Sequence, residues 1–219
     1  MITFHDIKNN ETIKTYITQA DNSLIALGYT EHSLAHVSTV ANTARYILET
    51  LGFSKHDVEL VQIAAYLHDI GNLINRAEHS QSGAILAFQI LNEMHVPAED
   101  IALIATAIGN HDEGTGVPVN AIAAALIIAD KTDVRRSRVR NQDFVTFDIH
   151  DRVNYAVIHS GVTIDESKSS IILDIGLDSH FSSVMDYFEI FMNRMILCRK
   201  AAEKLGLKFS LIINNQQLI

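Results

Sequence analysis

The chain has 219 residues, of which 47% are hydrophobic and 20% are charged, so it is predicted to fold rather than to stay disordered. Its formal net charge of −9 argues against a broad nucleic-acid-binding surface, because binding a phosphate backbone requires basic patches. The single cysteine, Cys198, excludes an intramolecular disulfide framework, the segment Met1–Asn10 lacks the apolar core of a signal peptide, and no apolar run is long enough for a membrane span. We therefore expect a cytoplasmic protein without nucleic-acid or membrane partners.

The first two thirds of the chain show the hydrophobic periodicity of consecutive helices. Apolar residues recur at helical spacing over 34–51, and Gly52 is expected to end that helix. The further helices are predicted at 57–70 with Gly71 as its C-terminal cap, at 79–94, at 100–108, and from Pro118 in a first turn through Asp130, with Arg138 as the furthest end.

The character of the sequence changes after about residue 141. Residues 155–164 and 170–177 are typical of two strands of a hairpin, and residues 208–213 of a third strand. Between them, an amphipathic helix is predicted to start near Phe181 and to end at Gly206. Its apolar stripe indicates either a core face or the seam of a homodimer. We expect two domains, a helical one over 1–141 and a small β-β-α-β one over 142–219.

Polar residues follow three very apolar helical runs. Helices that are apolar on every side lie in the middle of a bundle, so the residues at their ends are expected to be partly buried. Unpaired carboxylates are costly there, and a shared divalent metal ion is the economical partner, since imidazole and carboxylate are ordinary ligands of zinc, manganese and iron. The runs and the residues after them are 61–67 before His68 and Asp69, 101–108 before His111, and 121–129 before Asp130.

The dipeptide His-Asp is not itself evidence for a site, because it occurs five times in this chain. Only the pairs that begin at His68 and His111 follow apolar runs, and the other three are interpreted as surface or cap residues. His32 and His36 add to the candidate set, because a spacing of four places both rings on one face of a helix.

This arrangement resembles the HD superfamily of metal-dependent phosphohydrolases, whose pattern is a His on one helix, a His-Asp pair at the end of a later helix, and a distant Asp. The pattern covers residues 30–140, with His36 in HVSTVANTA, His68 and Asp69 in AAYLHDIGN, and Asp130 in LIIADKTD. The resemblance implies a mainly α fold, an HD-type helical bundle followed here by the small α+β domain. It also implies one metal ion on these four residues.

His79 and His111 match the additional ligands of HD proteins that hold two metal ions. That subset includes the HD-GYP cyclic-dinucleotide phosphodiesterases and the HD-type dinucleoside polyphosphate hydrolases. The resemblance implies a second divalent ion on these two residues with Asp69 as a bridge, and manganese or iron rather than zinc, magnesium or nickel.

The chain departs from the HD-GYP pattern in three places, which argues against cleavage of cyclic dinucleotides. Asn72 stands where that group has Lys, Asn110-His111 stands where it has paired His, and Gly116-Val117-Pro118 stands where it has Gly-Tyr-Pro. Glu is common at the position of His32, so His32 is either a ligand or a residue that supports one.

A basic segment follows Asp130. Its five Lys and Arg residues against one Asp, in an acidic protein, indicate an anion-binding patch. We expect Lys131, Arg135 and Arg136 to contact the phosphate of a substrate, and Lys131 to act in catalysis together with His68 and Asp69.

The predicted function is hydrolysis of a phosphoester or phosphoanhydride in a nucleotide-like small molecule by metal-activated water. Two alternatives stay open at this point. One is an HD-type di-iron oxygenase, which would use the same ligands. The other is a non-catalytic sensor that binds metal or nucleotide.

Overall fold

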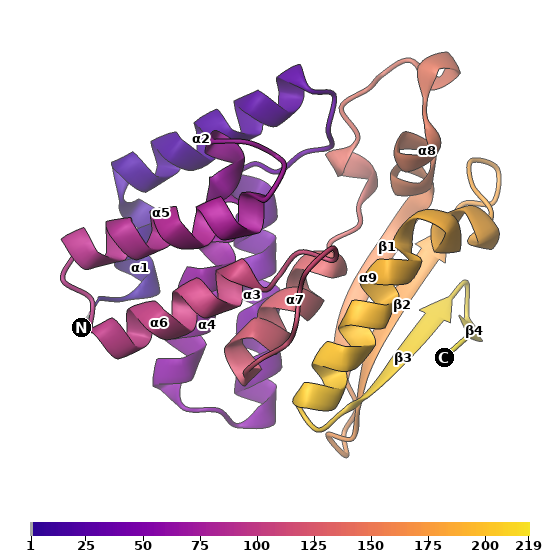
Figure 1. The fold of residues 1–219 in the computed structure, drawn as a ribbon. Coiled ribbons are helices and arrows are strands. Elements are labelled where there is room, and N and C mark those ends of the chain that lie inside the picture. The colour runs from indigo at the N-terminus through magenta and orange to yellow at the C-terminus, as the bar shows by residue number, and fades with distance from the viewer. Residues whose placement is uncertain (1) are drawn as a thin grey trace.

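The structure, a computed structural model, describes residues 2–219 and consists of a helical bundle beside a small sheet (Figure 1). The predicted fold class, mainly α with an α+β unit after the bundle, is confirmed. The helices of the bundle are α1 Phe4–Asn9, α2 Glu11–Ala26, α3 Leu34–Leu51, α4 Lys55–Leu67, α5 His79–Glu93, α6 Ala98–Gly109 and α7 Ala121–Lys131. The later elements are α8 Ile149–Ala156, β1 Val157–Ile164, β2 Ser170–Leu177, α9 Val184–Lys204, β3 Lys208–Ile213 and β4 Gln216–Gln217.

Helices α4 and α7 are the central helices of the bundle. All residues of α7 from Ile122 to Lys131 are buried, and so are all those of α4 from Leu60 to Leu67. A helix that is apolar on every side can bury all its faces only among other helices. The C-terminal ends of α4 and α7 therefore lie in the interior, as the apolar runs predict.

The end of α4 differs from its predicted position. The helix ends at Leu67, and a short 3-10 helix follows over Ile70–Leu73. Gly71 lies within that 3-10 helix and does not have the positive φ of a left-handed cap, unlike Gly28, Gly52 and Gly206. Its missing side chain serves packing instead, because a Cβ at Gly71 would stand 1.9 Å from the carbonyl oxygen of His79.

Two further boundaries correct the predictions. Helix α7 starts at Ala121, not near Pro118, because the Asn120 side chain caps it by accepting a hydrogen bond from the Ala123 N–H at 2.8 Å. The helix ends at Lys131, and only a 3-10 turn, Arg136–Arg138, follows toward the predicted limit. Residues 149–156 form α8, so the first strand begins at Val157, two residues later than predicted.

The sheet has the order β1-β2-β3-β4. Strands β1 and β2 pair antiparallel, β2 and β3 pair parallel across α9, and the two-residue β4 pairs antiparallel with β3. Alternate residues of β2 are buried, Ile171, Leu173 and Ile175 among them, so one face of the sheet is apolar. Helix α9 contacts β2 and β3 and also packs on α7, so it lies between the sheet and the bundle.

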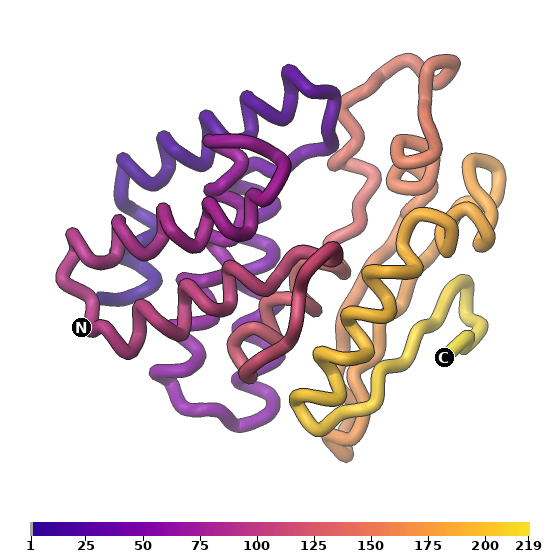
Figure 2. Tube along the Cα trace, in the orientation of Figure 1, coloured from indigo at the N-terminus to yellow at the C-terminus, as the bar shows by residue number. Residues whose placement is uncertain are grey.

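Bundle and sheet share one hydrophobic core, which runs from Ile7 through α7 and α9 to Ile213. The segment between α7 and α8 rises beside the end of α2 (Figure 2), where the Glu31 N–H donates to the Arg138 carbonyl at 2.9 Å.

The division into domains 1–141 and 142–219 stays a prediction. Within residues 2–219, no helix combines the length and the apolar character that crossing a bilayer requires.

Candidate metal centre

Four buried imidazoles of the bundle share one orientation. In each ring Nδ1 lies against an oxygen that can only accept a hydrogen bond, so Nδ1 carries the hydrogen and a neutral ring keeps its lone pair on Nε2. Such a contact behind a histidine is typical of metal-binding rings. The Nδ1 contacts are His36 to Asp133 Oδ2 at 2.7 Å, His68 to Ala65 O at 2.7 Å, His79 to Arg76 O at 3.1 Å, and His111 to Ile108 O at 2.6 Å.

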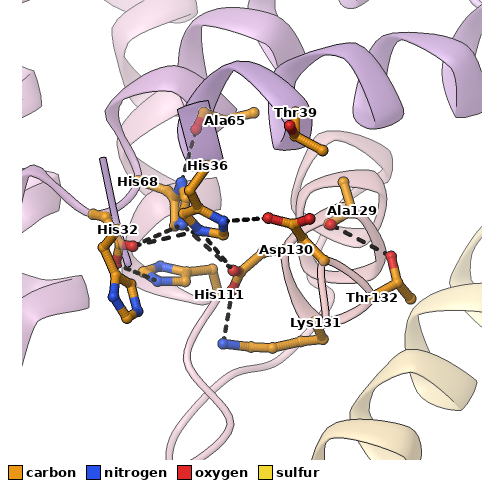
Figure 3. A network of polar contacts seen from close by, with 12 residues as sticks. His32, His36, Thr39, Ala65, His68, His111, Ala129, Asp130, Lys131 and Thr132 are labelled. Atoms are coloured by element: carbon orange, nitrogen blue, oxygen red, sulfur yellow. Dashed lines mark hydrogen bonds and ion pairs between the residues drawn. The ribbon is translucent and has the colours of Figure 1, made fainter. Parts of the chain in front are cut away.

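The first group of side chains surrounds one oxygen of Asp69. The Nε2 of His36 lies 3.6 Å from Asp69 Oδ2 and 3.4 Å from Asp130 Oδ1. The Nε2 of His68 lies 3.3 Å from Asp69 Oδ2 and 3.5 Å from Asp130 Oδ1. Figure 3 shows the rings of His36 and His68 converging with Asp130. These four side chains come from α3, the end of α4 and the end of α7.

The second group lies on the other oxygen of Asp69. The Nε2 of His79 is 3.5 Å from Asp69 Oδ1, and that of His111 is 4.0 Å from it. The two Nε2 atoms are 3.2 Å apart. His79 is the first residue of α5, and His111 follows the end of α6. Asp69 thus faces both groups, one with each oxygen.

The residues fit a divalent cation. Ligand atoms that lie about 2.1 Å from a common ion are separated by about 3.0 to 3.4 Å, close to the spacings in both groups. Among the described residues, the Nε2 atoms of His36 and His68 are buried and make no hydrogen bond. Two sets of three side chains have ligand atoms within 4.8 Å of one another, His36 with His68 and Asp130, and His68 with Asp69 and His111.

The negative charges of Asp69 and Asp130 favour a bound cation at the centre. Burial alone would raise the pKa of Asp69, but nearby His68 outweighs it and holds that pKa well below its usual value. Burial opposes charge on His68, yet Asp69 and Asp130 raise its pKa to about 10. Burial lowers the pKa of His111 well below its usual value, so that ring stays neutral. Two carboxylates therefore hold a proton on His68, which a bound metal ion would displace.

Two residues that the ligand pattern does not include hold the ligands in place. The amide Nδ2 of Asn72 donates to Asp69 Oδ1 at 3.0 Å and to the Asp69 carbonyl at 2.9 Å. Asp133 accepts from His36, and also from the Nε of Arg135 at 2.6 Å. Asn72, at the position of the HD-GYP lysine, therefore supports the carboxylate that faces both groups.

Replacement of Asp133 by asparagine is expected to weaken metal binding about 10- to 100-fold, because the carboxylate that orients His36 is lost. Equilibrium dialysis against manganese with elemental analysis measures the affinity. Asp165→Asn, in the exposed turn between β1 and β2, is the control and should bind metal as the parent protein does. Equal affinity of the Asp133 variant would show that His36 is held by packing alone.

Only one of the three residues predicted to contact phosphate lies at the centre. Lys131 reaches it, with Nζ 2.8 Å from Asp130 Oδ2 and 2.7 Å from Glu113 Oε2. Arg135 instead pairs with Asp133. Arg136 turns toward the C-terminal unit, which comprises α8, α9 and the sheet. There it donates a hydrogen bond to the Tyr155 carbonyl, and its guanidinium lies 4.4 Å from the centre of the Tyr155 ring. A run of charges along the chain does not show which side chains face inward.

The structure brings other cationic residues to the centre. A cavity of about 20 Å³, room for about one water molecule, lies against the two ligand groups. Arg76, Arg138 and Arg194 line it together with Lys131 and His32. Arg76 comes from the loop before α5, and Arg194 from α9, more than sixty residues beyond Asp130. No local signal in the sequence connects Arg194 with the ligands.

His32 lies beside the ligands. Its ring is 5.5 Å from that of His36, and its Nδ1 lies 2.7 Å from the Thr30 carbonyl. Burial lowers the pKa of His32 well below its usual value. The ring is therefore neutral and borders the cavity, and its role as ligand or support stays open.

Part of the chain is similar to known proteins. Residues 33–135 match the HD domain family. An uncharacterized protein of Methanocaldococcus jannaschii, MJ1020, is 27% identical over 160 residues, which cover 63% of this chain and 61% of that relative. The crystal structure of a predicted HD superfamily hydrolase from an uncultured Thermotogales bacterium has a TM-score of 0.46 and 22% identity, over 57% of this chain and 67% of that one. The residues that match the HD domain family include all six candidate metal ligands.

Proposed function

We propose that this protein hydrolyses a phosphoester or phosphoanhydride bond in a nucleotide-like small molecule, with two divalent metal ions. One observation carries the proposal: four imidazole Nε2 atoms and both oxygens of Asp69 converge on a buried centre lined by cationic side chains. In this proposal His36, His68, Asp69 and Asp130 hold one ion, and His79 and His111 hold the second with Asp69 as the bridge. Manganese and iron are the favoured ions.

Bound ions at such a site supply the charge that a phosphoryl group needs and lower the pKa of water. The residues of the chain do the rest. Arg76 and Arg138 border the centre and would bind phosphoryl oxygens, as guanidinium groups do well. Burial opposes charge on Lys131, but Asp130 and Glu113 raise its pKa, so it stays a cation next to the ligands. We assign Lys131 the role of stabilising the negative charge that develops on the phosphoryl group.

The test is a phosphate-release assay on a broad panel of phosphate esters and anhydrides. Protein purified without chelator is analysed for metal content, then assayed as isolated and after reloading with manganese, iron, zinc, magnesium or nickel. Oxygen uptake with iron is measured in parallel. Metal-dependent release of phosphate or of a nucleotide product supports the proposal. Metal-loaded protein that releases neither from any compound contradicts it.

Replacement of His79 by alanine is expected to lower the metal content from about two ions per chain to about one. This residue contacts only one oxygen of Asp69, so the group around His36 and His68 stays complete. Elemental analysis gives the count. His180→Ala removes an exposed imidazole and should leave the count unchanged. One ion per chain in both proteins would rule out the second ion, and two ions in both would show that His79 does not hold it.

A further inference from the structure

A second, larger cavity adjoins the metal centre. Its volume is about 360 Å³, within the range of sites for a single small molecule. Four residues line both this cavity and the small one at the ligands, so the two cavities adjoin: His32, Arg76, Arg138 and Arg194. One wall is the loop after α2, with Leu27 and Tyr29, and the opposite wall belongs to α8 and α9.

The guanidinium groups gather at the end near the metal ligands. Arg76 Nη1 lies 3.4 Å from His79 Nε2. Arg138 is buried and held in place, because its Nε donates to the Glu31 carbonyl at 2.8 Å and its Nη1 to the Asp133 carbonyl at 2.7 Å. Three guanidinium groups around one opening favour a phosphate at this end.

Arg194, in α9, is the residue of the C-terminal unit that lines the cavity near the metal ligands. Its guanidinium lies 4.6 Å from the centre of the buried Phe191 ring, and its Nε donates to Glu113 Oε1 at 3.0 Å. The Glu113 carboxylate also pairs with Lys131. Burial would raise the pKa of Glu113, but Lys131 and Arg194 hold it well below its usual value. Arg194 is therefore fixed in position rather than free in solvent.

The remainder of the cavity differs from the phosphate end. Tyr29 is 43% exposed, and Arg76 lies 5.5 Å from its ring centre, so the pair offers a flat surface for a planar group. At the start of α8, Asp148 and Asp151 add carboxylates, which accept hydrogen bonds from hydroxyl or amino groups. Phosphate, hydroxyl groups and a planar ring in one molecule are the parts of a nucleotide.

We propose that this cavity binds a nucleoside 5′-monophosphate group, with its phosphate among Arg76, Arg138 and Arg194 and its base against Tyr29. The inference rests on the proposed function for the fate of the phosphate, but the binding it describes can be measured without turnover. Because Arg194 and the wall on α8 lie outside residues 33–135, the C-terminal unit completes the substrate site.

The test is calorimetric titration of metal-loaded protein with the four ribonucleoside 5′-phosphorothioates, which resist hydrolysis, and with inorganic thiophosphate. At least one nucleoside compound is expected to bind more than about tenfold tighter than thiophosphate. Arg194→Met should weaken its binding about 10- to 100-fold, as expected for a lost hydrogen bond to a charged group. Tyr29→Ala should weaken nucleoside binding about 5- to 100-fold and leave thiophosphate binding unchanged.

Two matched controls separate these effects from general damage. Arg199→Met changes an exposed arginine of the same helix, and Tyr16→Ala an exposed tyrosine of α2; both should bind as the parent does. Metal content is measured for every variant. The inference is overturned if no nucleoside compound binds more tightly than thiophosphate, if Arg194→Met behaves like Arg199→Met, or if Arg194→Met loses metal. Binding that depends on Arg194 in a protein that hydrolyses nothing would sustain the inference and refute only the hydrolase.

Discussion

Replacement of Asp69 by asparagine is expected to remove nearly all bound metal and, with it, phosphate release. Asp69 Oδ2 faces His36 and His68, while Oδ1 faces His79 and His111, so one substitution removes a charge from both groups. Loss of a residue that only supports a ligand costs 10- to 100-fold in affinity, so loss of the shared carboxylate should cost more than about 100-fold. Elemental analysis and the phosphate-release assay measure the two effects.

Asparagine has nearly the size of aspartate, so the variant should keep its fold. Circular dichroism and the unfolding midpoint check this. Asp57→Asn, in the partly exposed first turn of α4, is the matched control and should retain metal and activity. Two ions per chain in the Asp69 variant would contradict the ligand assignment, whatever the activity.

Replacement of Gly71 by alanine is expected to lower the free energy of unfolding by about 3 kcal/mol or more, because the added methyl group has no room. It would stand 1.9 Å from the His79 carbonyl oxygen and 2.5 Å from the Gly83 backbone nitrogen, and backbone atoms cannot rotate away. Since α5 must then shift from the 3-10 helix after Asp69, His79 moves too, and the metal content should fall. Urea denaturation measures the stability.

Gly109→Ala is the control for this prediction. The nearest atom to its added Cβ is 3.6 Å away, which is an ordinary contact, so its free energy of unfolding should change by less than about 1 kcal/mol. Equal unfolding midpoints for the two variants would mean that α5 tolerates displacement and that the close approach at Gly71 has no energetic weight.

The sequence predicted the convergence of the ligands but not the surroundings of the site. His68, Asp69, His111 and Asp130 could be placed together because each follows a run too apolar to lie at a surface, and such runs meet inside a bundle. Helix ends were less certain, since the end of α4 depends on how closely α5 approaches Gly71, which is a contact between distant segments.

The cationic residues of the cavity show the same limit more sharply. A local excess of charge pointed to Arg135 and Arg136, yet these side chains pair with Asp133 and with the Tyr155 carbonyl. Arg194 belongs to an amphipathic helix whose apolar stripe predicts only packing. Arg194 reaches the centre because α9 packs on α7. The spacing of residues in the sequence does not predict that contact.

Because α9 packs on α7, residues from two different parts of the chain meet at the site. One part carries the candidate metal ligands, and the other forms a wall of the cavity proposed to select the substrate. The candidate metal ligands all lie within 36–130, whereas one wall of the larger cavity comes from 148–194. During divergence, substitutions among these wall residues would therefore change the cavity while the ligand residues stay the same. Descendants with the same metal centre would then act on different phosphate esters, and similarity confined to the HD domain would be a poor guide to their substrates.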